Sequence, residues 1–428
     1  MVQPLLRTLD EIEGADLSLV GGKAFRLALL RQHQLNVPPG LVLTTAFLGW
    51  MLAGTQMSIT PLVSRSATIS FLWPEQATPL QEGQKTMVAQ WFARYNAAFL
   101  LGAAAGGLLF GWLGDRAGRA RAMGLSIVCY SLFSGAAFFA ESPWVMLACR
   151  FASCLGVGGM WPNGIALVSE VLVKVPRTVL AGLIGTAANV GQVLMAIAAY
   201  YVEITPASWR WVMLVGASPV LVGAVVLAAV PESPRWLAER LRPRPGSGPV
   251  REVFRPPLLG VTLLGIVLGG IPLLGGWGSG NWLVPWADEV SGTADPQLKA
   301  MTQGQRSFGG AVSSLLGGWV ASRLGRRFSY FLISLGSLAT STYIFNYLSP
   351  RDSSFGWWAL VLGVVSGFYF GWLPLCLPEL FPTRVRSTGA GVTFNFGRIG
   401  AACGVMLNMP LVALFSGDYG RVGAVTSL

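Results

Sequence analysis

Most of this chain alternates between apolar segments of about 20 residues and short polar loops. A helix of about 20 residues crosses the roughly 30 Å hydrocarbon core of a bilayer. We therefore predict an all-α membrane protein with eleven spanning helices, whose boundaries hold to within about two to four residues. The predicted spans cover residues 39–63, 92–113, 121–140, 143–171, 178–202, 209–230, 257–287, 303–321, 328–348, 356–377 and 388–415.

Composition supports the membrane prediction and excludes several other classes. Hydrophobic residues make up 53% of the 428 residues and charged residues 11%, against about 25% charged in soluble proteins. The net charge of +11 does not indicate nucleic acid, because the positive residues lie in short loops. A single histidine, His33, excludes a histidine triad or a multi-histidine metal site. We expect no cofactor, a monomer, and a bilayer and a small-molecule substrate as partners.

A short polar motif occurs twice at half-chain spacing. The segment Gly111–Ala120 (GWLGDRAGRA) returns 207 positions later as Gly318–Arg327 (GWVASRLGRR). Duplicated halves in so apolar a chain indicate a transporter. The same shift places a twelfth span at about 416–437, so we expect that span to be cut off at Leu428, with Asp418 and Arg421 interrupting the remainder.

Positive loops predict the orientation in the membrane. Sixteen lysines and arginines fall in loops on one side of the predicted spans, which the positive-inside rule makes cytoplasmic. The N-terminus lies on the same side, and we expect a multi-pass protein of the cell inner membrane. The division of the chain is predicted as an N-terminal segment 1–38, an N-terminal bundle 39–231, a cytoplasmic linker 232–256 and a C-terminal bundle 257–428.

These features resemble the major facilitator superfamily over nearly the whole chain from Leu41. The repeated motif is similar to that family's signature loops, between spans two and three and between spans eight and nine. Two further segments, Pro231–Trp236 (PESPRW) and Pro378–Arg384 (PELFPTR), resemble its sugar-porter and aromatic-acid symporter branches. The resemblance implies a two-bundle fold and secondary transport of a sugar or an organic or aromatic acid by alternating access.

The resemblance also implies gating residues in the signature loops. Asp115 is expected to face the start of span eleven near Ser387, whereas the second copy has Ser322 at this position. Glu170 and Glu379 are expected to pair with the signature arginines near Arg116 and Arg323; ordinary solvated loop charges are the alternative. The full gating set is Asp115, Arg116, Arg119, Glu170, Arg323, Arg326, Glu379 and Arg384.

Two arginines, Arg150 and Arg398, lie inside predicted spans, where a charge costs about 2.5–3.5 kcal/mol unless it faces a partner or a cavity. In proton-coupled relatives a carboxylate of span one pairs with the arginine of span four, but here Ala53 and Gln56 stand in the comparable stretch. None of the acidic residues lies deep in a span, so facilitated diffusion or exchange fits better than proton symport. A transport-inactive or fused protein is the alternative.

Polar and aromatic residues of the spans predict a substrate path. Lone amides can also bond neighbouring helices, and tryptophans at the outer end of span seven can form an interfacial belt. The predicted pathway residues are Gln56, Asn96, Arg150, Asn163, Asn189, Gln192, Asn281, Trp282, Tyr369, Asn395 and Arg398.

The first forty residues differ in character. Leu9–Phe47 resembles the start of the nucleotide-binding domain of phosphoenolpyruvate synthase and pyruvate phosphate dikinase, through Leu19–Ala24 (LVGGKA) and Val37–Gly40 (VPPG). The match covers about forty residues without the rest of an ATP site, so we expect no ATP chemistry. A membrane-anchored phosphotransferase fragment is the third hypothesis, and ATP binding by residues 1–60 would support it.

Overall fold

The computed structural model describes residues 39–75, 80–172, 175–233, 236–237, 249–292, 294–382 and 385–427. Within these ranges the regular structure is entirely helical, as predicted. The predicted segment 1–38 lies outside the described residues, as do Arg384 and part of the linker 232–256.

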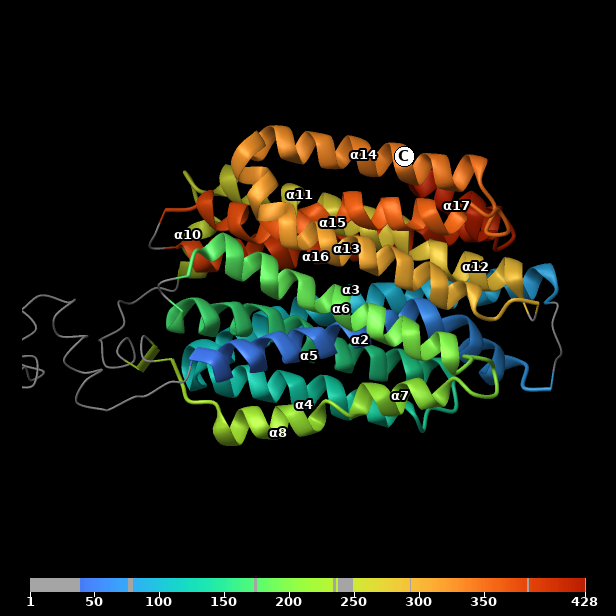
Figure 1. Cartoon of the computed structure of the whole chain (residues 1–428), viewed down its shortest axis with the longest axis horizontal. Helices are drawn as coiled ribbons and strands as arrows, with labels where there is room; N and C mark the ends of the chain where they lie inside the picture. The colour runs from blue at the N-terminus through green and yellow to red at the C-terminus, as the bar shows by residue number, and fades with distance from the viewer. Residues whose placement is uncertain are drawn as a thin grey trace, which may run out of the picture.

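The helices form two bundles that lie side by side, with the earlier half of the chain in one and the later half in the other (Figure 1). The first bundle contains α2 (Pro39–Leu72), α3 (Glu82–Ala117), α4 (Arg119–Ala137), α5 (Pro143–Val171), α6 (Arg177–Tyr201), α7 (Arg210–Ala217) and α8 (Val220–Ala229). The second contains α11 (Leu259–Leu274), η3 (Gly275–Ser279), η4 (Gly280–Trp282), α12 (Leu283–Ser291), α13 (Leu298–Leu324), α14 (Arg326–Tyr347), α15 (Phe355–Glu379), α16 (Arg386–Leu414) and α17 (Tyr419–Thr426). The short helix α10 (Pro249–Val253) precedes the second bundle.

Ten helical segments of the described chain are long and apolar enough to cross a membrane, against the eleven predicted. The difference lies in α13, the predicted eighth span, which is present at full length but is less apolar than the others. It carries Gln303, Gln305 and Arg306, and one of its faces packs against α6 and α15. Polar residues on a face that packs against protein lower the mean hydropathy of a helix without exposing them to lipid.

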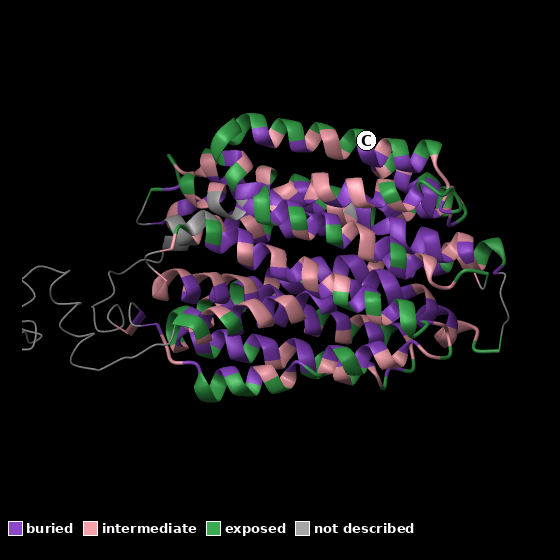
Figure 2. Cartoon of the chain, viewed as in Figure 1, coloured by how far each residue is buried: buried purple, intermediate pink, exposed green. Residues whose placement is uncertain are grey.

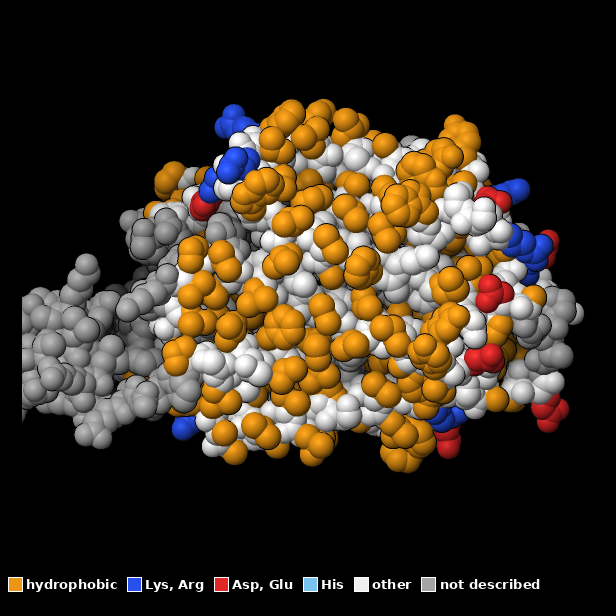
Figure 3. Space-filling view, viewed as in Figure 1, with side chains coloured by type: hydrophobic (Ala, Val, Ile, Leu, Met, Phe, Trp, Pro, Cys, Tyr) orange, Lys and Arg blue, Asp and Glu red, His pale blue; other side chains and the backbone are white. Residues whose placement is uncertain are grey.

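Apolar side chains cover the middle of the molecule, and charged side chains gather at its two ends (Figure 3). The central faces of the inner helices are buried, while α8 and α14, at opposite edges, are largely exposed (Figure 2). This banding matches a protein whose outer surface faces lipid. We call the end that carries the turns at Gly118 and Gly325 the arginine-rich end.

Both turns have the same construction, which confirms the repeat as structural. Gly118 (φ 116°) separates α3 from α4, and Gly325 (φ 81°) separates α13 from α14. Positive φ angles are accessible to glycine without steric penalty, so each motif turns the chain tightly between two helices. In each motif the arginine four residues after the tryptophan lies over the tryptophan ring: Arg116 over Trp112, and Arg323 over Trp319.

The last element corrects a prediction. Asp418 and Arg421 were expected to interrupt the final segment, but the Asp418 carboxylate accepts a hydrogen bond from the Arg421 backbone N–H at 3.0 Å. Asp418 is therefore the N-cap of α17, a position that aspartate favours because it satisfies a free N–H of the first turn.

Glycines let the helices of the first bundle cross at close range. A Cβ on Gly191 would overlap the carbonyl oxygen of Met51, and a Cβ on Gly54 would overlap that of Ala188. The two glycines therefore face each other's helix across the α2–α6 contact, as small residues do in membrane bundles.

We predict that Gly191→Ala destabilises the protein by about 1–3 kcal/mol, because the added methyl must push α2 and α6 apart. The measurement is the apparent melting temperature of purified protein in detergent. Gly260→Ala is the matched control, since nothing lies within 4 Å of a Cβ there. Equal melting temperatures for the two variants would contradict the role of this crossing.

Candidate functional site

A cavity of about 470 Å³ lies between the two bundles, enclosed by helices of both. Its polar and aromatic wall includes Trp50, Phe99, Trp161, Asn189, Gln192, Trp277, Asn281, Arg306, Ser307, Tyr369, Phe370, Phe394 and Arg398. Among the described residues no aspartate or glutamate lines it. The cavity therefore combines two guanidinium groups and several aromatic faces without a carboxylate.

Arg306 is the charged residue of the wall that the sequence analysis missed. It lies on α13, and its Nη2 donates a hydrogen bond to Asn281 Oδ1 at 2.9 Å. That is the one hydrogen bond the structure describes for this guanidinium, which has five N–H donors. The sequence could have identified Arg306 by its position near the start of the predicted span 303–321, because charged residues inside membrane spans often mark functional sites.

Arg398 enters the cavity from α16 and also joins the two bundles. Its Nη1 donates to the backbone oxygen of Ala103 on α3 at 3.0 Å and to Asn395 Oδ1 at 3.2 Å. Its guanidinium carbon lies 4.8 Å from the centre of the Phe394 ring. Arg398 is thus held more firmly by protein groups than Arg306.

Aromatic side chains form two pairs in the cavity wall. Trp50 and Trp161 have ring centroids 4.9 Å apart, both in the first bundle. Phe99 of α3 stacks on Trp277 of η3 at 4.0 Å, so this pair bridges the bundles. Such faces bind flat conjugated groups through stacking and apolar contact.

Amide side chains of α6 contact α13 beside the cavity. Gln303 Nε2 donates to Gln192 Oε1 at 3.0 Å, and Asn189 Nδ2 donates to Ser314 Oγ at 3.3 Å. Gln192 and Asn189 line the cavity while bonding across the bundle interface.

The predicted pathway residues divide into two groups. Five of them line the cavity: Asn189, Gln192, Asn281, Tyr369 and Arg398. The other six, which are absent from the described wall, are Gln56, Asn96, Arg150, Asn163, Trp282 and Asn395.

Three of these six, Asn163, Asn395 and Trp282, contact neighbouring helices or their own helix instead of the cavity. Asn163 Nδ2 donates to the backbone oxygens of Phe110 and Gly159 at 2.9 Å each, and Asn395 Nδ2 donates to Gly391 O. Trp282 is fully buried with its ring 5.0 Å from that of Phe92, so it belongs neither to the cavity nor to an interfacial belt.

Arg150 and Gln56 form a closed polar core within the first bundle. The Arg150 side chain is 1% exposed, and its Nη2 donates to the Gln56 backbone oxygen at 2.9 Å and its Nη1 to Gln56 Oε1 at 3.4 Å. Ser153 also donates to Gln56 Oε1, while Gln56 Nε2 donates to Gly216 O at 2.6 Å. Arg150 therefore points into the first bundle and does not reach outward to the membrane interface.

The signature arginines pair with the expected carboxylates, but through the later arginine of each motif. Arg119 Nε lies 3.7 Å from Glu170 Oε1, and Arg326 Nη2 lies 2.8 Å from Glu379 Oε1. Arg119 Nη1 also lies 2.6 Å from Asp115 Oδ1. Arg116 and Arg323, the other arginines of the two motifs, lie over tryptophan rings. The expected contact of Asp115 near Ser387 involves a side chain outside the described ones.

The PESPRW segment docks onto the first signature loop, a contact that the sequence analysis did not predict. The Glu232 carboxylate accepts hydrogen bonds from the Ala120 and Arg121 backbone N–H groups at 3.1 and 2.9 Å. It caps α4, where free N–H groups and the helix dipole favour a negative charge. Trp236 Nε1 donates to the Asp115 backbone oxygen at 3.1 Å.

An ion cluster joins the bundles at the end opposite the arginine-rich one, with Lys299 and Asp288 buried at its centre. Lys299 Nζ lies 2.9 Å from Asp288 Oδ1, and it donates to the Ile204 backbone oxygen at 2.6 Å. Arg65 Nη1 lies 3.8 Å from Asp288 Oδ2, and Lys85 Nζ lies 3.4 Å from Glu289 Oε1. The cations Arg65 and Lys85 come from the first bundle and the carboxylates from α12.

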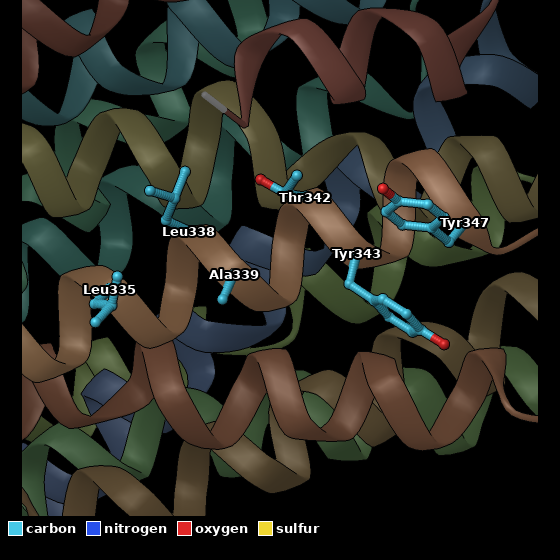
Figure 4. Close-up of a pocket in the computed structure, with 6 residues that line it drawn as sticks. All are labelled: Leu335, Leu338, Ala339, Thr342, Tyr343 and Tyr347. Carbon is cyan, nitrogen blue, oxygen red and sulfur yellow. The ribbon is translucent and has the colours of Figure 1, made fainter.

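A second pocket, of about 400 Å³, follows the surface of α14 (Figure 4). Its lining residues are Leu335, Leu338, Ala339, Thr342, Tyr343 and Tyr347. The pocket carries no charged side chain among these residues, and most of them are exposed on the lipid-facing side. The central cavity is therefore the candidate functional site.

We predict that Gln56→Leu destabilises the protein by about 1.5–3 kcal/mol, because it removes a side-chain acceptor from a buried guanidinium. Thermal unfolding of the purified protein is the measurement. Thr55→Val is the control, since the Thr55 hydroxyl donates only to Leu52 O of its own helix. Gln56→Leu with wild-type stability would show that Arg150 does not need this amide.

Comparison with known proteins identifies relatives along most of the chain. It is 27% identical to a cis,cis-muconate transport protein of Acinetobacter baylyi over 71% of this chain and 74% of the relative. It is 26% identical to a putative niacin/nicotinamide transporter of Bacillus subtilis over 87% and 88%, respectively. The crystal structure of a D-xylose-proton symporter matches 90% of this chain and 95% of its own, with a TM-score of 0.66 at 20% identity, which supports the fold.

These relatives are transporters and not enzymes, so they do not favour the transport-inactive or phosphotransferase hypotheses. They also give no support to the dikinase-like resemblance of the first forty residues. The Major Facilitator Superfamily model matches residues 45–405, which is most of the chain. With its two helical bundles and central cavity, the chain belongs to the Major Facilitator Superfamily, as a multi-pass membrane transporter of small organic solutes.

Proposed function

We propose that this chain transports small organic anions by alternating access. The observation that carries the proposal is a cavity with two arginines, Arg306 and Arg398, and no carboxylate among its described lining residues. Neither arginine has an ion-pair partner in the part of the chain that the structure describes. A guanidinium held inside a membrane protein requires a counter-charge or water, and a substrate carboxylate supplies the charge and matches its planar fork.

The aromatic wall narrows the proposed substrate to a flat or conjugated acid. Trp50, Trp161, Phe99 and Trp277 offer faces beside the arginines. Cis,cis-muconate, for which the Acinetobacter baylyi relative is named, is an acid of this type, and so is niacin, one of the two compounds in the name of the Bacillus subtilis relative. A sugar would leave both guanidinium groups without a charge partner.

For the mechanism, we propose that units 39–231 and 257–428 rock about the cavity, joined by the linker 232–256. The ion pairs Arg119–Glu170 and Arg326–Glu379 each lie within one bundle and brace its arginine-rich end. Asp115, Arg116, Arg323 and Arg384 belong to the same proposed gating set. Since contacts within a bundle persist during rocking, they keep each bundle rigid while the interface changes.

We further propose that the arginine-rich end faces the cytoplasm, with the N-terminus on that side of a cell inner membrane. The concentration of arginine in its loops supports this orientation through the positive-inside rule. Each chain holds a complete central cavity, which supports transport by a monomer.

We predict that Arg306→Gln weakens binding of cis,cis-muconate by roughly 30-fold or more, because loss of a buried charged partner costs about 2–5 kcal/mol. Counterflow in proteoliposomes and equilibrium binding in detergent measure the effect. Arg351→Gln, at an exposed position outside the cavity, is the matched control. Exchange of D-xylose without exchange of any carboxylate would overturn the proposal.

We also predict that proton movement is not coupled to transport, because an amide, Gln56, occupies the place beside Arg150 where a titratable carboxylate would be needed. A pH-sensitive dye inside the proteoliposomes should report no muconate-dependent proton flux. Gln56→Glu is the comparison, and we expect its counterflow to depend on pH. A muconate-dependent proton flux in the unaltered protein would show that another group carries the proton.

A further inference from the structure

The segment from η4 to α12 and the helix α13 form a hairpin with two polar contacts at matched positions. Arg306 Nη2 donates to Asn281 Oδ1 at 2.9 Å beside the cavity. About two helical turns further from the arginine-rich end, Lys299 Nζ lies 2.9 Å from Asp288 Oδ1. One hairpin therefore carries both the anion site and the ion cluster at the opposite end, which is the outer end in the proposed orientation.

Both contacts are also tied to the first bundle. Asn281 Nδ2 donates to Asn96 Oδ1 of α3 at 3.4 Å. At the outer end, Lys299 Nζ donates to Ile204 O at 2.6 Å and to Ser66 Oγ of α2 at 3.4 Å. The Lys299 side chain is only 3% exposed, so these contacts exclude water when the bundles meet. Separation of the bundles at this end must break all of them.

Asn96 has no other evident role in packing. Its side chain is fully buried, and its Nδ2 has no hydrogen-bond partner among the described residues. An unsatisfied buried amide costs about 1–3 kcal/mol, so its one cross-bundle hydrogen bond through Oδ1 does not stabilise the closed state strongly by itself. Its position in the chain Asn96–Asn281–Arg306 connects the first bundle to the guanidinium.

The positive charge of Arg306 explains why the contacts between Asn96, Asn281 and Arg306 would respond to an anionic substrate. Without an anion, the Arg306 guanidinium lacks a counter-charge, and water in the cavity is the better environment for it. A bound carboxylate neutralises the Arg306 guanidinium. Water can then leave the cavity, and the hairpin can pack against α2 and α3. Closure of the outer ion cluster then follows from neutralisation at the cavity.

We propose that Asn281 and Asn96 are positioning residues that couple anion binding at Arg306 to closure of the outer end. The inference rests on the proposed transport of organic anions. Asn281 orients the guanidinium, and Asn96 holds Asn281 against the first bundle. The anion thereby favours the state in which Asp288, Lys299 and Arg65 meet.

Val284 provides a site for a reporter of outer closure. It lies on α12 between Asn281 and Asp288, is fully buried, and belongs to one apolar cluster with Ile59 and Leu62 of the first bundle. A cysteine there is shielded when the outer end is closed and reachable when it opens. The experiment uses Val284→Cys in the full-length protein after replacement of the five native cysteines, in a background that retains muconate counterflow.

In this reporter protein, saturating cis,cis-muconate should slow labelling by a membrane-impermeant maleimide about tenfold or more. Asn96→Ala should lose most of this protection and, because binding and closure are linked, should bind muconate up to about tenfold more weakly. Asn163→Ala is the matched control, because Asn163 is also a buried asparagine but bonds only within the first bundle. It should keep both binding and protection.

Asn281→Asp gives a second, opposite readout. Its carboxylate would supply Arg306 with an internal counter-charge, so labelling should be slow without muconate and muconate affinity should fall. Protection that persists in Asn96→Ala, or fast labelling of Asn281→Asp, would overturn the coupling. If neither muconate nor niacin binds the reporter protein, the proposed transport of organic anions is wrong. If either compound binds without slowing the labelling of Val284→Cys, only the proposed coupling is wrong.

Discussion

A guanidinium inside a membrane protein must be surrounded by acceptors, by water or by a ligand, and this constraint organises the centre of the molecule. Arg150 meets it within one bundle at its two terminal nitrogens, through the backbone and side chain of Gln56. Arg398 satisfies it partly across the bundle interface, at the backbone of Ala103. Arg306 has one amide oxygen and a cavity, so its environment is completed by whatever the cavity contains.

The three arginines therefore have different consequences for transport. The buried arginine of the first bundle is a structural element, because its partners move with it during rocking. The arginines of the second bundle face the cavity, while the first bundle contributes the aromatic faces of Trp50, Phe99 and Trp161. Both charges thus come from the second bundle and aromatic surface from both, so a substrate that uses an arginine and an aromatic face of the first bundle must draw the bundles together.

Contacts at the two ends of the molecule differ in kind. At the arginine-rich end, the described ion pairs of the signature loops lie within single bundles. At the opposite end, Arg65 and Lys85 of the first bundle meet Asp288 and Glu289 of the second. Of the ionic contacts that must break for the outer end to open, the Arg65–Asp288 pair is largely buried, so its strength depends on the exclusion of water, whereas Lys85 of the other pair is partly exposed.

Much of the architecture was predictable from the sequence. The length of each apolar segment predicts a membrane-spanning helix, and the repeated motif at Gly111 and Gly318 predicts two similar halves. The glycines at 118 and 325 follow from the same repeat, since both turns need a positive φ. Pairing of the later arginines, Arg119 and Arg326, with Glu170 and Glu379 was not predictable, because it depends on which side chain projects toward the neighbouring helix.

For the site, the sequence by itself determined which polar residues enter the spans and that no acid stands beside Arg150. Only the tertiary structure decided that Asn189, Gln192 and Arg398 reach the cavity while Asn163 and Trp282 do not. The physical reason is rotational: a helix can turn any polar residue toward a neighbour, a cavity or lipid, and packing against other helices selects the direction. Packing likewise brought Arg306 to Asn281, two residues far apart in the sequence whose contact no local pattern encodes.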